Sequence, residues 1–222
     1  MSKGKLIVLE GLDGSGKATQ AKLLAEHLAA QGVPVQKITF PDYASDSSAL
    51  VKMYLAGQFG QHPDDVNAYA ASSFYAVDRY ASYKTSWGSF YEQGGVIIAD
   101  RYTTSNAVHQ CSKLPPEQWD DFLCWAFDYE YRLLGLPAPD AVFIGGSKGS
   151  LAAIVDAVLD KNPDARICVS AIALESLSAA VAALTAKGRT VQVSQIAVSR
   201  ARAVGGLHLM MAQNPIYLIT GE

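Results

Sequence analysis

Short apolar runs alternate along the chain with longer stretches in which apolar residues recur at helical spacing. The run Lys5–Glu10 is typical of a buried strand, and Gly16–Gln31 has one apolar face and is followed by Gly32, as helices often are. The alternation continues along the chain and predicts a mainly parallel sheet covered by helices on both faces. The other predicted strands are Val35–Phe40, Gly95–Asp100, Ala141–Ile144, Arg166–Ala171, Val191–Val198 and Pro215–Thr220, and the other helices lie in Ser48–Ala56, Asp64–Glu92, Pro116–Leu134, Ser150–Leu159 and Leu174–Lys187.

The end of the chain departs from this alternation. No helical pattern occurs between Val198 and Pro215, so the last two strands are predicted to be antiparallel neighbours. The predicted fold is therefore α/β, a three-layer sandwich with a mainly parallel sheet that ends in an antiparallel strand pair. Because no repeat or Pro/Ser-rich linker divides the chain, we expect residues 1–222 to form one domain on a single sheet.

Composition excludes several classes of protein. Half of the 222 residues are apolar and the net charge is −3, which suits a buried core and argues against a nucleic acid polymer as partner. No apolar run approaches the ~18 residues of a membrane span, and the first residues lack the cleavage region of a signal peptide. Cys111, Cys124 and Cys168 have no metal-binding spacing, and we expect reduced thiols in a cytoplasmic protein.

Composition also changes along the chain. Residues 1–140 carry a net charge of −5 and 19 of the 21 aromatic residues, whereas residues 141–222 carry a net charge of +2. Two interpretations remain open: an Ala/Val/Leu-rich half of the same domain, or two segments of different ancestry.

The clearest chemical motif is a glycine-rich turn between the first strand and the first helix. It has the form GxxxxGK, in which backbone N–H groups, a helix N-terminus and a lysine surround a phosphate chain. The alternative is a glycine-rich turn with a surface lysine. Ala18 stands where Ser or Thr usually offers a hydroxyl to Mg²⁺, so the motif predicts phosphate binding better than metal binding. The candidate nucleotide-binding residues are Gly11, Gly14, Ser15, Gly16, Lys17, Ala18 and Thr19.

Two further groups of residues are candidates for ligand contacts. Asp100 and Arg101 follow a predicted strand, at the edge where parallel sheets bind ligands, so Asp100 could hold Mg²⁺ and Arg101 a phosphate. A strand-end ion pair is the alternative. Tyr75 and Arg79 share one face of a helix and could hold a base between them, although a tyrosine packed in the core is the commoner explanation.

Together these motifs resemble the thymidylate kinase family. The resemblance covers residues 3–144 and rests on the loop Glu10–Gln20, the turn Phe40-Pro41-Asp42, the pair Asp78-Arg79 and the segment Asp100–Ser105. It implies that ATP and Mg²⁺ are used if any activity remains, and that a nucleotide, phosphate or sulfate ion occupies the loop. The implied catalytic residues are Asp13 beside the acceptor sugar, Lys17 on the donor phosphates and Arg101 on the acceptor phosphate.

The resemblance also implies an acceptor site for a thymine base. Tyr75 would stack on the base, while Arg79 and Gln110 would bond its polar edge. Tyr43 stands where many relatives have a phosphate-binding arginine. A thymidylate kinase also needs a basic lid after the fourth strand, but here Gly145–Ser150 contributes only Lys148, and no arginine follows until Arg166.

Residues 139–222 resemble another family, the precorrin C15 decarboxylating methyltransferases. The resemblance is to their carboxyl-terminal half and rests on Pro139–Ser147, Asn162–Arg166, Ala171–Glu175 and Asn214–Tyr217. Because the kinase loop occupies the position of the turn that binds S-adenosylmethionine in those enzymes, we expect no use of that cofactor.

We interpret the chain as a P-loop/Rossmann-like hybrid, an engineered chimera joined near Pro139–Gly146. Three functional hypotheses follow: a scaffold that keeps the phosphate site with little or no catalysis, an active dTMP kinase, or a fold with an empty loop. The oligomeric state is left open by the sequence.

Overall fold

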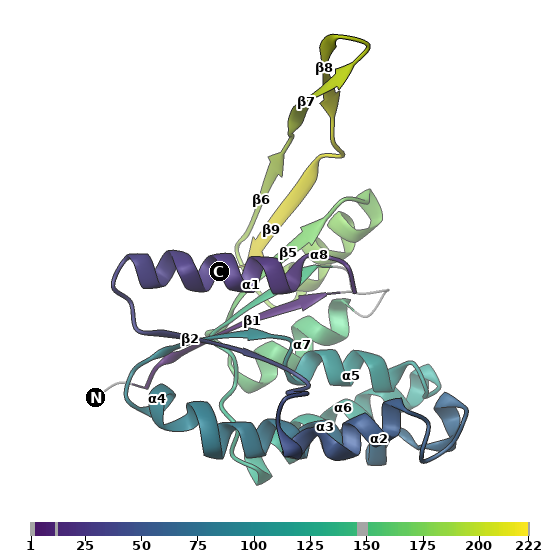
Figure 1. Ribbon diagram of the computed structural model, residues 1–222. Helices are drawn as coiled ribbons and strands as arrows, with labels where there is room; N and C mark the ends of the chain where they lie inside the picture. The colour runs from purple at the N-terminus through teal and green to yellow at the C-terminus, as the bar shows by residue number, and fades with distance from the viewer. Residues whose placement is uncertain (1–2, 12, 146–150, 222) are drawn as a thin grey trace.

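A computed structural model of the protein describes residues 3–11, 13–145 and 151–221. Its strands are β1 (Lys5–Gly11), β2 (Val35–Thr39), β3 (Val96–Asp100), β4 (Ala141–Gly145), β5 (Arg166–Ala171), β6 (Val191–Ile196), β7 (Ser199–Val204), β8 (Leu207–Ala212) and β9 (Ile216–Gly221). Seven of them form one sheet in the order β2-β3-β1-β4-β5-β9-β6, and β7 and β8 form a separate ribbon (Figure 1). β1 to β5 are parallel, and β9 runs antiparallel to both β5 and β6. The predicted α/β fold and its antiparallel end are confirmed.

The helices follow the predicted order with local differences. They are α1 (Lys17–Ala30), α2 (Ala49–Leu55), α3 (Ala68–Ser82), α4 (Gly88–Glu92), α5 (Thr103–Cys111), α6 (Trp119–Phe127), α7 (Leu151–Lys161) and α8 (Leu174–Ala186). The predicted helix Asp64–Glu92 is divided, because a π-helical turn separates α3 from α4, and a second such turn, Asp128–Leu133, follows α6. None of the described helices has the length and apolar character needed to cross a bilayer.

Two elements were not predicted. One is α5, whose sequence is largely polar; part of its first turn is capped by Glu10 of β1, a partner distant in sequence. The other is the ribbon β7-β8, which occupies the link that was predicted only to lack a helix. Its turn is Gly205-Gly206, both at positive φ (56° and 81°), and a Gly-Gly pair between apolar runs is a hairpin signal that the prediction missed.

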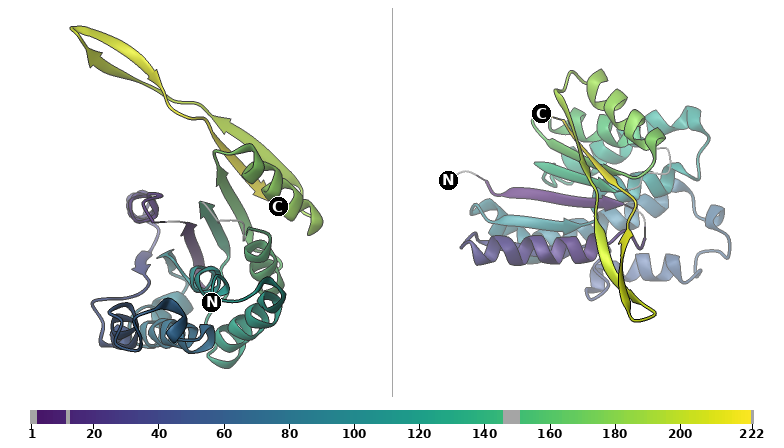
Figure 2. Two further views of the ribbon diagram at one scale, coloured as in Figure 1. Left: turned by 90° about the vertical axis from the view of Figure 1, so that its right-hand side faces the viewer. Right: turned by 90° about the horizontal axis from the view of Figure 1, so that it is seen from above.

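The direction of the connections explains how the helices are distributed over the two faces of the sheet. The connection through α1 runs from β1 toward the β2 edge of the sheet, whereas each later connection that contains a helix runs toward the β6 edge. Because such crossovers are right-handed, α1 lies on one face and the helices α3 to α8 lie on the other (Figure 2). On the α1 side, Leu9 and Ile98 pack against Ala21, whereas the opposite side holds the main core around Val8, Val142 and Val169.

This distribution leaves part of the sheet covered on one side only. Within the described residues, α1 contacts β1, β2 and β3, and no helix lies over the same face of β4, β5, β9 and β6 (Figure 2). We call this part the open face. It carries Phe143, which is 43% exposed, together with Cys168, Ile196, Ile216 and Leu218. The predicted three layers are therefore complete only over β2, β3 and β1.

The two compositionally different segments meet inside the sheet. Gly11 of β1 pairs with Gly145 of β4, and a Cβ atom added to Gly11 would lie 2.1 Å from the carbonyl oxygen of Gly145. The close approach of the two backbones therefore requires glycine at position 11.

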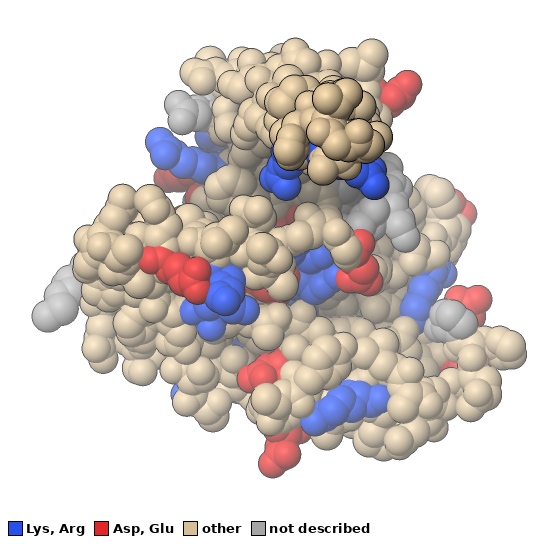
Figure 3. Space-filling model, turned by 45° about the horizontal axis from the view of Figure 1, so that its top comes forward, with Lys and Arg blue, Asp and Glu red and all other residues tan. Residues whose placement is uncertain are grey.

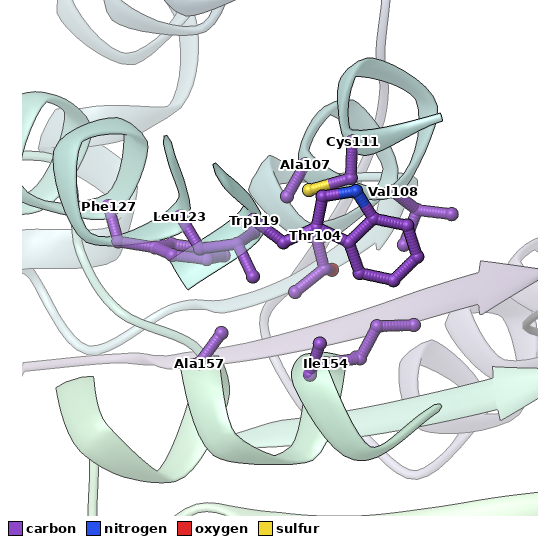
Figure 4. A pocket seen from close by; sticks show the side chains of 10 residues that line it. Thr104, Ala107, Val108, Cys111, Trp119, Leu123, Phe127, Ile154 and Ala157 are labelled. Carbon is purple, nitrogen blue, oxygen red and sulfur yellow. The ribbon is translucent and has the colours of Figure 1, made fainter. Parts of the chain in front are cut away.

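Below the sheet, α5 and α6 pack against α7 across a small apolar cavity of about 10 Å³ (Figure 4). The cavity is lined by Thr104, Ala107, Val108, Cys111, Trp119, Leu123, Phe127, Ala153, Ile154 and Ala157.

We expect Val108→Ile to stabilise the protein by about 0.5–1 kcal/mol, because one added methylene would bury itself in this cavity. Urea unfolding monitored by circular dichroism measures the change. Val77→Ile is the matched control, since Val77 is exposed on α3 and its extra carbon would stay in water. A loss of stability in Val108→Ile would contradict the prediction and indicate that the packing between the segments is already tight.

Candidate functional site

The glycine-rich loop has the backbone geometry of an anion site. Gly11, Gly14 and Gly16 have φ values of 152°, 78° and 85°, a region in which residues with a Cβ atom are strained. Gly16 directly precedes α1, so the loop leads into the positive end of that helix. Ser15, Ala18 and Thr19 are exposed around the start of the helix. The predicted nucleotide-binding residues thus lie together at the carboxyl end of β1.

Lys17 begins α1 and lies half-buried between the loop and the strand ends. Burial lowers the pKa of Lys17, the nearby Arg101 lowers it further, and Asp100, Asp13 and Glu10 act in the opposite direction. The net result is a pKa below the ordinary value. An anion bound beside Lys17 would favour the charged form of the lysine, so the lysine and the bound anion would stabilise each other.

The predicted acceptor residues line one large pocket beside the loop. This pocket of about 600 Å³ lies among α2, α3 and α5, and an adjoining pocket is lined by Asp100 together with Asp13 and Arg101. The structure therefore brings together residues from four separate stretches of sequence. The predicted site residues that line the larger pocket are Asp13, Tyr75, Arg79, Arg101 and Gln110, and Tyr43 lies at the same rim.

Arg101 connects the pocket to the loop. Its φ is 69°, an uncommon value for a residue with a side chain, and it is the only described non-glycine residue at positive φ. One guanidinium nitrogen donates to Ser105 Oγ at 3.2 Å, and another donates to the carboxylate of Asp13. Local backbone strain of this kind is often found at functional sites, and here it directs a cation toward the cleft between loop and pocket.

Arg79 has a partner that the sequence analysis did not identify. Its Nε and Nη2 donate to Glu130 Oε2 and Oε1, both at 2.6 Å, and both side chains are 2% exposed. Burial lowers the pKa of Arg79, but the adjoining Glu130 carboxylate more than offsets this and holds the pKa above its ordinary value. The guanidinium is therefore fixed at the pocket wall by Glu130 of the π-helical turn after α6.

The floor of the pocket presents polar oxygens without partners. Gln110 Oε1 and Asn106 Oδ1 are buried and accept no hydrogen bond from the described protein atoms. Because an unsatisfied buried acceptor is costly, such atoms point to a ligand that supplies donors. Tyr75 stands at the side, edge-on to Tyr54 with 6.4 Å between ring centroids, and burial, with Tyr54 and Tyr43 nearby, raises the pKa of Tyr75 to about 12.

Sequence reasoning missed two residues with clear positions in the site. Asn106 was not selected, although it is one helical turn before Gln110 on the same helix and shares its face. Glu10 is buried at the end of β1, where its carboxylate accepts hydrogen bonds from Tyr102 N at 3.0 Å, Ser105 N at 3.2 Å and Thr104 Oγ1 at 2.5 Å. It thereby ties the start of α5 to the strand that carries the loop. An acid at the end of an otherwise apolar strand was the available signal.

The described residues offer a modest donor set for Mg²⁺. No group of three His, Cys, Asp or Glu side chains within the described ranges could enclose a metal ion. Mg²⁺ bound with a nucleotide needs only one or two carboxylates besides phosphate oxygens, and buried Asp100, beside the loop, fits that requirement. Ala18 provides no hydroxyl.

The fold and the glycine-rich loop define a P-loop type of α/β protein. The thymidylate kinase family model matches residues 9–148, and the chain belongs to this family. A second family model, the precorrin methyltransferase domain, matches residues 126–220. The chain thus consists of two parts that are related to two different families. The two matches overlap over residues 126–148, which include β4.

Individual relatives divide in the same way. The chain is 33% identical over 136 residues to thymidylate kinase of Mycobacterium tuberculosis, covering 61% of the chain and 62% of that enzyme. It is 40% identical over 88 residues to a probable cobalt-precorrin-6B C(15)-methyltransferase of Pyrobaculum calidifontis, covering 40% of the chain and 45% of the relative. The structure of thymidylate kinase from Candida albicans superimposes with a TM-score of 0.54 at 25% identity, covering 76% of the chain and 85% of that structure. The chain therefore spans about three fifths of the length of the curated kinases and less than half of the methyltransferase.

Proposed function

We propose that the protein is an engineered hybrid domain that binds nucleotides, with a phosphate chain at the glycine-rich loop and a thymidine monophosphate in the acceptor pocket, but with little or no catalysis. The observation that supports this proposal is that the predicted acceptor residues line one pocket, in a chain that changes family before the part expected to hold the donor nucleotide. The loop, the pocket and Asp100 all precede residue 126, where the second family begins.

Phosphoryl transfer depends on positioning and on neutralising the charge of the moving group. Lys17 lies beside the loop, and Arg79, Arg101 and Lys113 line the pocket; of these three, Arg101 also pairs with Asp13 of the loop. In the segment after β4, the first arginine is Arg166 at the amino end of β5, whereas the loop lies at the carboxyl end of the parallel β1. The expected lid position, including Lys148, lies outside the described residues. Binding without efficient turnover is the function that this arrangement supports best.

The position of the join supports an engineered origin. A natural fusion normally adds whole domains, whereas here the family changes in the middle of a sheet, between β1 and β5 on either side of β4. Residues of both segments share the main core, including Leu6 and Ile167. One hybrid domain is therefore the organisation we infer.

The three cysteines, which form no disulfide in the described chain, support a reducing cytoplasmic setting.

One observation favours the alternative, an active dTMP kinase. The ribbon β7-β8 leaves the sheet at the carboxyl end of β6, the same edge as the loop, and it carries Arg200 and Arg202. Basic side chains lie beneath the ribbon in the view of Figure 3. A coupled assay with dTMP, ATP and Mg²⁺ decides between the two functions. Steady ADP formation that requires dTMP and disappears in an Arg200→Ala/Arg202→Ala variant would replace our proposal by this alternative.

Binding of the acceptor is tested with Arg101→Met. We expect this variant to bind dTMP roughly 10- to 100-fold more weakly, because a charge-assisted hydrogen bond to the phosphate is lost, and to bind thymidine without change. Isothermal titration calorimetry with both ligands makes the measurement. Arg132→Met is the matched control, since Arg132 is exposed and pairs with Asp128 away from the pocket. Equal dTMP affinity of Arg101→Met and the unmodified protein would refute the assigned role.

A further inference from the structure

The outer wall of the acceptor pocket is a short helix that depends on contacts with other elements. This wall consists of α2, seven residues with one buried side chain, Val51, and of the segment that leads from α2 into α3. A helix this short gains little stability from its own backbone. Tyr54 and Leu55 of α2 line the pocket, and so does Lys113, two residues beyond the end of α5. The position of the wall therefore depends on what holds α2.

Lys113 joins three elements at this place. Its Nζ donates to Tyr54 Oη of α2 at 2.6 Å and to the carbonyl oxygen of Val66, just before the N-cap of α3, at 3.1 Å. The same ammonium group lies 4.9 Å from the centroid of the Tyr54 ring. The backbone of Lys113 is fixed to α5, because its N–H donates to Gln110 O at 3.0 Å. Lys113 thus ties α2 and the start of α3 to the helix that carries Gln110.

The chemistry of these contacts favours a fixed position for the ammonium group. A charged donor forms shorter and stronger hydrogen bonds than a neutral one, and the neighbouring aromatic ring adds a cation–π attraction. Lys113 is half-buried and Val66 is 8% exposed, so water has limited access to the contacts. Removal of the ammonium group would take this donor away from the Val66 carbonyl and leave the Tyr54 hydroxyl without its charged partner.

Tyr54 connects Lys113 to the residue that is predicted to stack on the base. The Tyr54 ring is edge-on to Tyr75, with an interplanar angle of 88°, and it is tilted against Phe74 with 6.3 Å between the ring centroids. Edge-to-face contacts of this kind favour a defined orientation of both rings. The orientation of the half-buried Tyr75 ring therefore depends on Tyr54, whose hydroxyl is held by Lys113.

We propose that Lys113 is a positioning residue of the acceptor pocket: it holds α2 and Tyr54, and through Tyr54 the ring of Tyr75, in the arrangement that receives the base. The inference rests on the proposed function for the identity of the ligand. A wall that is already in place does not have to be ordered on binding, so a larger fraction of the molecules is competent and the affinity rises in proportion. Because both acceptors of Lys113 belong to the wall, its effect should be the same for thymidine and for dTMP.

Calorimetric titration of Lys113→Met with thymidine and with dTMP tests this role. Both ligands should bind roughly 10-fold more weakly, the loss expected if the wall is competent in about a tenth of the molecules. Lys113→Arg should restore most of the affinity, since a guanidinium group can donate to both acceptors. Lys84→Met is the matched control, because Lys84 is also a lysine beside a tyrosine, 5.6 Å from the centroid of the Tyr80 ring, but does not line the pocket. It should leave both affinities unchanged.

A double variant tests whether Lys113 acts through Tyr54. Tyr54→Phe keeps the ring but removes the hydroxyl that accepts from Lys113. If the two side chains act as one unit, adding Tyr54→Phe to Lys113→Met should weaken thymidine binding no further. An additional loss equal to that of Tyr54→Phe alone would show that the two side chains act independently, contrary to the proposal.

Hydrogen–deuterium exchange of the ligand-free protein measures the wall directly. The amides of α2 should exchange about 10-fold faster in Lys113→Met than in the unmodified protein, because local opening of α2 becomes easier. The amides of α1, on the other face of the sheet, should exchange at an unchanged rate, as should those of α2 in Lys84→Met.

Several results would overturn the proposal. These are unchanged exchange of α2 in Lys113→Met, unchanged affinity for both ligands, equal losses in Lys84→Met, or a loss confined to dTMP, which would indicate a direct contact between Lys113 and the phosphate. An unmodified protein that binds neither thymidine nor dTMP would refute the proposed function instead. The exchange of α2 would then decide by itself whether Lys113 holds the wall.

Discussion

Replacing Glu130 by alanine should lower the free energy of unfolding by about 3–5 kcal/mol, the largest loss we expect from any single substitution at the site. Arg79 and Glu130 form two hydrogen bonds at 2.6 Å with both side chains removed from water. Without the carboxylate, the buried guanidinium keeps its charge, because arginine is not deprotonated in proteins. Urea unfolding followed by far-UV circular dichroism measures the change.

The double variant Arg79→Met/Glu130→Leu is the control that separates a missing partner from a missing interaction. Buried ion pairs replaced by apolar residues of similar size often cost little, since the desolvation of both charges is also removed. We therefore expect the double variant to regain most of the stability lost in Glu130→Ala. A single variant that loses under about 1 kcal/mol would mean that water reaches Arg79, contrary to its 2% exposure.

We expect ATP or pyrophosphate to protect the protein against thermal unfolding, and Lys17→Ala to abolish this protection. A ligand at 100 times its dissociation constant adds about 2.7 kcal/mol, which corresponds to roughly 5–10 °C in the unfolding midpoint of a domain of this size. Differential scanning fluorimetry with increasing ATP measures the shift. The physical reason is that Lys17 supplies the full positive charge at the loop, beyond the partial charges of backbone N–H groups.

Lys22→Ala provides the matched control for this experiment. Lys22 lies on the same helix, is exposed and pairs only loosely with Glu26 at 3.7 Å, so its removal should leave the protection unchanged. S-adenosylmethionine is the control ligand and should give no protection. Undiminished protection of Lys17→Ala would show that ATP binds elsewhere.

The protection should also depend on pH in a defined direction. The pKa of Lys17 lies below its ordinary value because burial and Arg101 disfavour the charged form. As the pH rises through that lowered pKa, Lys17 loses its charge and anion binding weakens, at a less alkaline pH than an ordinary lysine would require. Binding that strengthens on the alkaline side would contradict this assignment.

The sequence alone predicted those parts of the site that depend on near neighbours. The strand, the three glycines at positive φ and the helix that begins at Lys17 follow one another within a few residues, so the loop was identifiable from its motif. The predicted acceptor residues were identified from the resemblance to thymidylate kinases, and in the structure they line one pocket. Asn106 was missed because the position of its buried, unpartnered acceptor oxygen depends on how α5 is oriented, which no local pattern encodes.

Other features depend on partners that are distant in sequence. Arg79 is fixed by Glu130, 51 positions away, and the start of α5 by Glu10, more than 90 positions away. Neither contact leaves a periodic signal, since each joins single residues from separate elements. The largely polar α5 was overlooked for the same reason: its stability comes from a cap and from packing supplied by other parts of the chain.

The sequence by itself determined the alternation of strands and helices, the glycine-rich loop and the change of family near β4, because each depends on the order and spacing of adjacent residues. Only the tertiary structure decided which face of the sheet each helix covers. That choice follows from the strand order and the right-handed connections, which place α1 alone among the described helices on one side of the sheet and leave no described helix over the open face.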